Sequence, residues 1–119
     1  MQKRINMPSS DDVRTHLPMR AVAFAVVAAL AHGPRPGIEI LEEVNATVPG
    51  GALLGPGTLY RLMRELRQQG LIAREERGAR STDERQAHHA LTPLGRAVMR
   101  AEIARLRRTL HLASSPAEP

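Results

Sequence analysis

The sequence contains no cysteine, and its only aromatic residues are Phe24 and Tyr60. Without cysteine the chain forms no disulfide and has no thiolate for catalysis or metal binding, which agrees with a reducing compartment. Hydrophobic residues make up 42% of the chain, so the core must be built from Leu, Val, Ile, Met and Ala, a composition typical of packed helices. With 119 residues, we expect one compact domain and a short appendage.

Long apolar runs are missing as well. The longest, residues 21–31, is closed by His32, Gly33 and Pro34. It is shorter than the roughly 18 residues that a membrane span requires, so it predicts a buried helix. The first twelve residues have no apolar stretch and no small-residue cleavage site, so no signal peptide is expected and the expected location is the cytoplasm.

Basic residues exceed acidic ones by 17 to 12, which gives a formal net charge of +5. A basic balance favours a polyanionic partner such as nucleic acid. Sixteen of the seventeen basic residues are arginine, which coding bias explains as readily as phosphate binding does. Composition therefore does not decide the function, and the order of the elements must be considered.

The first two thirds of the chain predict three helices. Residues 1–15 are polar and without apolar periodicity, so we expect a disordered arm there. A helix from Pro18 ends at Gly33-Pro34, and a second one spans residues 38–47. In the third, Leu59, Leu62, Met63 and Leu66 recur at helical spacing between a capping Thr58 and a terminating Gly70.

The remainder predicts a hairpin and a long helix. Residues 71–73 and 87–91 are the expected strands, joined by a polar loop over residues 78–85. Thr92 and Pro93 then begin a helix that runs to Ala113, followed by a disordered tail over residues 114–119. Residues spaced alternately by four and three along this helix form an apolar seam suited to pairing with another helix; they are Met99, Ile103, Leu106, Leu110 and Ala113.

Three helices followed by two strands is the order of a winged helix-turn-helix, so the expected fold class is mainly α with a small β-hairpin. Several segments resemble the PadR family of bacterial transcriptional regulators; they are Leu30-Ala31-His32-Gly33-Pro34, Gly37-Ile38-Glu39-Ile40, Leu54-Gly55-Pro56-Gly57-Thr58-Leu59-Tyr60, Gly70-Leu71-Ile72 and Leu91-Thr92-Pro93-Leu94-Gly95-Arg96. The resemblance covers residues 17–113. It implies a winged-helix DNA-binding domain over residues 16–92, a dimerisation helix over residues 93–113, and repression by the dimer.

Two departures from the family pattern bear on DNA binding. Pro36-Gly37-Ile38 stands where relatives commonly have His-Gly-Tyr, so an aromatic residue near DNA is missing. The second wing strand is also less basic than in relatives. Between residues 57 and 85 there are seven arginines and five acidic residues. This excess of two charges predicts ordinary affinity.

Four residues of the third helix are candidates for contacting DNA. Thr58 is either a helix cap or, with the free backbone N–H groups, a phosphate ligand, and the resemblance favours both roles together. Tyr60 either packs in the core or donates to the DNA backbone, which the resemblance favours. Arg61 and Arg64 are three residues apart, so both can enter one groove; the alternative is a solvated face.

In the wing, Arg77, Gly78, Arg80 and Arg85 are candidates for phosphate or minor-groove contact, against the alternative of solvated charges. His88 and His89 are adjacent in a predicted strand, so they point to opposite faces and do not favour a shared metal ion. A proton-dependent wing is the other hypothesis for them. Neither a catalytic triad nor a Walker loop is present, so we expect no enzyme activity and no cofactor.

The sequence therefore predicts a nucleoid-associated homodimer that binds double-stranded DNA at a pseudo-palindromic operator and represses transcription. One alternative is a winged-helix module that has lost specific DNA binding and docks a protein partner. Another is ligand sensing, with a small-molecule effector bound between the final helix and the core. The sequence does not identify the operator or an effector.

Overall fold

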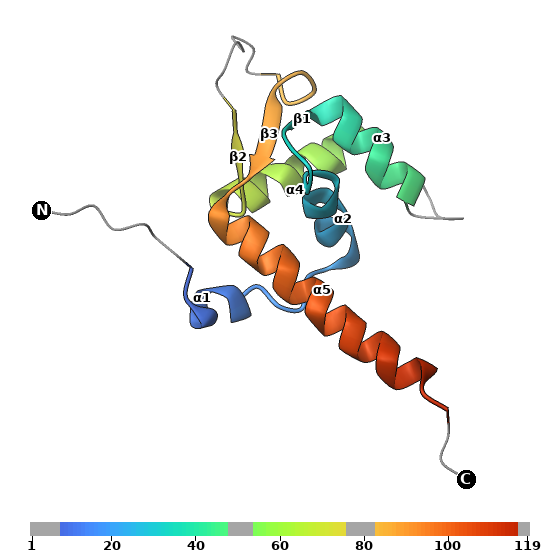
Figure 1. The fold of residues 1–119 in the computed structure, drawn as a ribbon. Helices are drawn as coiled ribbons and strands as arrows, with labels where there is room; N and C mark the ends of the chain where they lie inside the picture. The colour runs from blue at the N-terminus through green and yellow to red at the C-terminus, as the bar shows by residue number, and fades with distance from the viewer. Residues whose placement is uncertain (1–7, 48–53, 76–82, 117–119) are drawn as a thin grey trace, which may run out of the picture.

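The computed structural model describes residues 8–47, 54–75 and 83–116 (Figure 1). Within these ranges, five helices and three short strands follow in the order α1 (Ser10–Arg14), α2 (Ala21–Ala29), β1 (Arg35–Pro36), α3 (Gly37–Thr47), α4 (Pro56–Gln68), β2 (Ile72–Arg74), β3 (His88–Leu91) and α5 (Pro93–Ser114). The predicted fold class, mainly helical with a small hairpin, is confirmed. Among these helices, none is long and apolar enough to cross a membrane.

The core is aliphatic, as the composition predicts. Val26 and Val27 of α2 and its C-cap residue Leu30 lie in the centre of the molecule and are fully buried. They meet buried residues of α3, α4, the start of the hairpin and α5, namely Ile40, Val44, Leu59, Met63, Leu66, Leu71, Ile72, Val98 and Met99. Burial of this apolar surface supplies the main driving force for folding and fixes α4 against α2 and α3.

The sheet has three strands instead of the predicted two. Its order is β1-β3-β2, and both pairs are antiparallel. In the additional pair, Arg35 lies opposite His89 and Pro36 opposite His88. Proline in general disfavours a strand, but Pro36 lies at the edge of the sheet, where its missing N–H does not interrupt the pairing.

Helix α1 lies within the segment that is predicted to be disordered. The side chain of Ser9 caps it by accepting a hydrogen bond from the Asp12 amide at 3.0 Å. Val13 and Leu17 pack against the core. A local cap and two partly buried apolar residues thus order this helix against the core, although the segment has no repeating apolar pattern.

Two helices, α2 and α4, begin at other residues than predicted. α2 begins at Ala21 instead of Pro18, because residues 18–20 form the connection from α1. α4 begins at Pro56, with Gly55 as its N-cap, so Thr58 lies in the first turn and does not cap the helix. The fixed φ of proline suits the first helical position, which explains the earlier start.

The start of α5 agrees with its prediction. The Thr92 hydroxyl accepts a hydrogen bond from the Gly95 amide at 2.9 Å and donates to the carbonyl of Gly70. Val98, Met99 and Glu102 on the first half of α5 are buried, whereas Leu110 and Leu112 are 64% and 77% exposed. Figure 1 shows the C-terminal half of α5 extending beyond the other helices, at the opposite end from the hairpin.

Candidate nucleic-acid interface

Helix α4 separates its apolar residues from its basic ones. Leu59, Met63 and Leu66 are buried, while Thr58, Arg61 and Arg64 are exposed. Neither Arg61 nor Arg64 forms an ion pair with any residue in the described ranges. Three of the predicted DNA-contacting residues therefore share one solvent-facing side of α4, and two carry unneutralised positive charge.

The N-terminus of α4 is open. Gly55 has no side chain to cap the helix, and the first turn contains no acidic residue. Pro56 has no N–H, and the amides of Gly57 and Thr58 have no hydrogen-bond partner among the described residues; both residues are exposed. The free amides and the helix dipole give this end a partial positive charge suited to a phosphate oxygen.

Tyr60 lies on the boundary of α4 with the core. Its ring packs against the core cluster. Its hydroxyl is buried and has no hydrogen-bond partner among the described residues. Burial raises the pKa of this phenol, while the charge of Arg85 opposes the rise and Asp83 and Glu84 add to it. The hydroxyl is thus enclosed beside the base of the wing in the free chain.

Of the predicted wing residues, only Arg85 belongs to the described part; Arg77, Gly78 and Arg80 lie outside it. The Arg85 side chain is exposed. Its amide donates to the Asp83 carboxylate at 3.0 Å, and its carbonyl accepts from the Ile38 amide at 2.9 Å. The backbone of Arg85 is therefore anchored to the start of α3, while its guanidinium faces solvent.

An ionic cluster that no sequence pattern indicates joins α4 to the hairpin. Arg67 donates to the Glu84 carboxylate at 2.9 Å, and Arg74 of β2 donates to the other oxygen of the same carboxylate. Burial acts to raise the pKa of Glu84, but the hydrogen bonds and charges of these arginines outweigh it and lower the pKa. Arg67 and Arg74 thus share one carboxylate, and the three groups together keep a single net positive charge.

The two histidines of β3 face opposite sides, as predicted. His88 is exposed, and His89 has no exposed surface. The Nε2 atom of His89 lies 3.3 Å from the Glu84 carbonyl, and its Nδ1 has no partner among the described residues. Burial lowers the pKa of His89. The described residues contain no cluster of His, Asp and Glu that could hold a metal ion.

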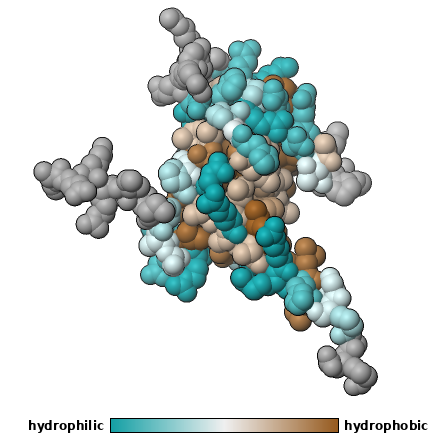
Figure 2. Space-filling model, viewed as in Figure 1, coloured by the Kyte–Doolittle hydropathy of each residue, from teal (hydrophilic) through white to brown (hydrophobic). Residues whose placement is uncertain are grey.

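The predicted dimerisation residues divide into two groups. Met99 is only 6% exposed and Ile103 packs against the core, so both contact their own chain. Leu106 is half-buried, and Leu110 and Ala113 are exposed. Figure 2 shows hydrophobic side chains on the projecting end of α5, where Leu110 and Leu112 lie. The free apolar surface of α5 is thus confined to its C-terminal half.

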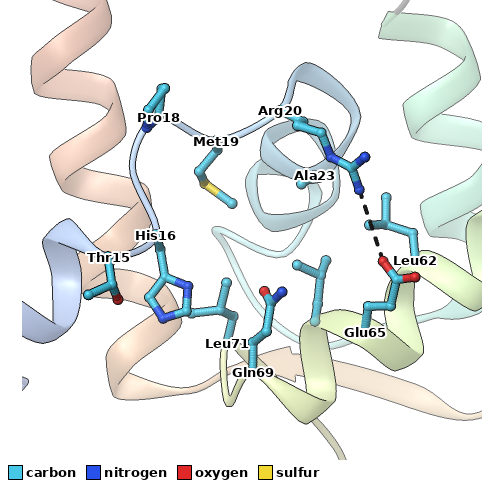
Figure 3. Close-up of a pocket in the computed structure, with 11 residues that line it drawn as sticks. Thr15, His16, Pro18, Met19, Arg20, Ala23, Leu62, Glu65, Gln69 and Leu71 are labelled. Carbon is cyan, nitrogen blue, oxygen red and sulfur yellow. Dashed lines mark ion pairs between the residues drawn. The ribbon is translucent and has the colours of Figure 1, made fainter.

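A cavity of about 210 Å³ lies between α4 and the connection from α1 to α2 (Figure 3). Arg20 and Glu65 form an ion pair across one side of it, with 4.0 Å between the nearest nitrogen and oxygen. From α4 and its C-cap it is lined by Leu62, Glu65, Leu66 and Gln69. The cavity and the exposed basic side of α4 therefore use different residues of the same helix.

Comparison with known proteins places the chain in a family. The model of the transcriptional regulator PadR-like family matches residues 26–101. A search of curated proteins gives no match. The matched residues include the basic helix α4 and all three strands.

Similar solved structures are also regulators. A transcriptional regulator from Clostridium thermocellum superposes with a TM-score of 0.61 at 19% identity, over 92% of this chain and 98% of that one. A MarR family regulator from Neisseria meningitidis gives 0.57 at 22% identity, over 88% and 69%. BpsR of Bordetella bronchiseptica, whose DNA binding is regulated by 6-hydroxynicotinic acid, gives 0.61 at 18%, over 92% and 73%.

At these identities the structural likeness shows the winged-helix fold, and the family match adds the class of function. Both agree with the geometry, in which a helix with exposed arginines and an open N-terminus lies beside a small antiparallel sheet. The chain belongs to the transcriptional regulator PadR-like family and is a DNA-binding regulator with a winged helix-turn-helix fold.

Proposed function

We propose that the chain is a sequence-specific repressor that binds a pseudo-palindromic operator as a homodimer. The observation that carries this proposal is the exposed side of α4, where Arg61 and Arg64 have no acidic partner in the described residues and the helix N-terminus is open. In this proposal α4 is the recognition helix. Its arginines read base edges in the major groove, and its first turn binds a backbone phosphate.

The proposed dimer forms through the C-terminal half of α5. Leu106, Leu110 and Ala113 follow one another at helical spacing on the part of α5 that extends from the body. Pairing of two such helices places two copies of α4 on the same side of the DNA, about 34 Å apart for successive major grooves. An operator occupied in this way is closed to the transcription machinery.

The experiment is selection of random duplex DNA by the purified full chain, repeated at two salt concentrations. We expect an inverted repeat to be enriched and its binding to weaken steeply as salt rises, because phosphate contacts release counterions. Replacement of Arg61 or Arg64 by Ala should weaken operator binding by about 1–3 kcal/mol for each base that the variant no longer recognises.

Arg108→Ala is the matched control, since Arg108 is an exposed arginine of α5 that lies about 200° around the helix from Leu106 and so off the proposed dimer surface. It should leave operator binding unchanged. Equal binding by the parent, Arg61→Ala and Arg64→Ala would exclude α4 as the reading element.

A protein-docking module is the second candidate, because the cluster around Glu84 reduces the free positive charge near α4. Arg67 and Arg74 are both paired with Glu84, which leaves Arg61, Arg64 and Arg85 as the arginines of the described interface without an acidic partner among the described residues. Failure to select any consensus, together with weak binding that disappears at moderate salt, would favour this candidate over the repressor.

A further inference from the structure

We propose that Glu84 is a positioning residue that fixes the wing to the recognition helix, and that its carboxylate thereby strengthens DNA binding despite carrying the same charge as DNA. The inference rests on the proposed function and deepens it. Counting charges along the sequence gives the opposite expectation, in which Glu84 dilutes the positive charge of the wing.

The carboxylate of Glu84 connects the segment before β3 to two consecutive elements, α4 and β2. One oxygen accepts from Arg67 near the C-terminus of α4, and the other accepts from Arg74 of β2. The Glu84 side chain is 13% exposed, and those of Arg67 and Arg74 are 24% and 28% exposed. A largely enclosed carboxylate with one arginine on each oxygen is a geometrically restrictive contact, unlike a surface ion pair.

The backbone around Glu84 is fixed to a third element. The Gly37 amide at the start of α3 donates to the Ala87 carbonyl at 3.2 Å, and the Ile38 amide donates to the Arg85 carbonyl at 2.9 Å. The contact is close, since a Cβ on Gly37 would lie 2.1 Å from the Glu84 carbonyl oxygen. Glu84 therefore lies where α3, α4 and the hairpin meet, and its carboxylate sets the position of the other two relative to α3.

Removal of the carboxylate leaves two arginines without their acceptor. Arg67 and Arg74 are both about three-quarters enclosed and both act on the same carboxylate, so they would repel each other and must move apart or toward solvent. Arg67 belongs to α4 and Arg74 to β2, so this movement separates the wing from the recognition helix. A wing out of position no longer reaches phosphate while α4 occupies the groove.

The test compares operator binding by full-chain Glu84→Gln and Glu42→Gln. Both remove one negative charge, but Glu42 is an exposed residue of α3 with no ion pair among the described residues. We expect Glu84→Gln to bind about tenfold more weakly than the parent and Glu42→Gln to bind as well as the parent or slightly better. Equal or tighter binding by Glu84→Gln would overturn the proposal.

Glu84→Asp preserves the charge and shortens the side chain by one methylene. It therefore tests the proposal even if Glu84→Gln fails to fold. Positioning predicts weaker binding for it, whereas a purely electrostatic role predicts parental binding. A double-mutant cycle with Arg67→Gln adds a second criterion. If Arg67 acts through Glu84, the double variant binds no more weakly than the weaker single variant; additive effects would show that Arg67 contacts DNA by itself and would overturn the link.

Amide hydrogen exchange separates failure of this inference from failure of the proposed function. Faster exchange in β2 and β3 of Glu84→Gln than of Glu42→Gln is expected whether or not DNA is bound. If the parent selects no operator, the repressor proposal fails, while the link between Glu84 and the wing is not affected. If exchange in the hairpin of Glu84→Gln is unchanged, that link is overturned.

Discussion

His89 has no exposed surface, and its ring lies below the turn that carries Glu84. Burial lowers the pKa of this histidine below its ordinary value of 6.5, more than the Glu84 carbonyl and carboxylate raise it. The unfolded chain therefore binds a proton at His89 more readily than the folded chain does. The contribution of His89 to the free energy of unfolding is fully present above about pH 6.5, and it is lost as the pH decreases toward the pKa of His89 in the folded chain. Glu84 and Glu102, whose pKa values are lowered, lose their contributions only at lower pH.

We therefore expect the free energy of unfolding to decrease on going from pH 7.5 to about pH 5.5, a range in which carboxylates stay ionised. His89→Gln should lose most of this dependence, even if its stability at pH 7.5 is lower. His88→Gln is the control, because His88 is the exposed neighbour in the same strand. Urea unfolding at fixed protein concentration measures the slope, and a parental slope in His89→Gln would contradict the assignment.

The basic residues differ in how far sequence predicts their surroundings. Arg61 and Arg64 lie on the polar side of α4 because the apolar residues of that helix repeat at helical spacing, so periodicity is sufficient to expose them. Arg67 and Arg74 are separated from Glu84 by 17 and 10 positions, and no local pattern relates them. Their pairing with Glu84 follows from the tertiary fold, so a charge count along the sequence does not show which arginines stay free on the surface.

The elements that sequence predicts are those with strong local signals. Repeating apolar residues indicate α3 and α4, and Thr92-Pro93 indicates the start of α5. Helix α1 has five residues and β1 has two, so neither repeats a pattern. Both are formed by contacts with distant parts of the chain, β1 by pairing with β3 and α1 by packing beside α5. Only the folded chain supplies those contacts.

The position of α5 depends on close contact at Gly95. A Cβ at this position would lie 1.9 Å from the Leu71 carbonyl oxygen and 2.8 Å from its carbon, so an alanine requires the backbone of α5 or of the α4–β2 connection to shift. Since Leu71 is buried, Gly95→Ala should lower the free energy of unfolding by about 1–3 kcal/mol.

Gly57→Ala provides the comparison for this overpacking. Gly57 lies in the first turn of α4, and nothing lies within 4 Å of a Cβ built there. Alanine is the better helix former, so this variant should be as stable as the parent or gain up to about 1 kcal/mol. Thermal or urea unfolding measures both, and equal stability of the two variants would show that α5 does not rest on Leu71 as closely as the structure indicates.

For the whole molecule, the decisive feature is that the hairpin and the projecting half of α5 lie at opposite ends (Figure 1). Leu110 is four residues after Leu106 and three before Ala113, so these three share one side of the helix. Leu112 lies about 200° around the helix from Leu110. Both leucines are strongly exposed, at 64% and 77%, yet only Leu110 belongs to the proposed seam, which makes them a matched pair for testing it.

We expect Leu110→Glu to weaken dimerisation by at least about tenfold, because a charged group placed in an apolar seam loses its hydration without gaining a partner. Leu112→Glu should remain dimeric. Sedimentation velocity over a concentration series measures both. Monomeric Leu110→Glu should also bind a single half-site about as well as the parent chain does, while losing the avidity for two half-sites that a linked pair provides. A dimeric Leu110→Glu beside a monomeric Leu112→Glu would assign pairing to the opposite side of α5, and two dimeric variants would move the interface away from the end of this helix altogether.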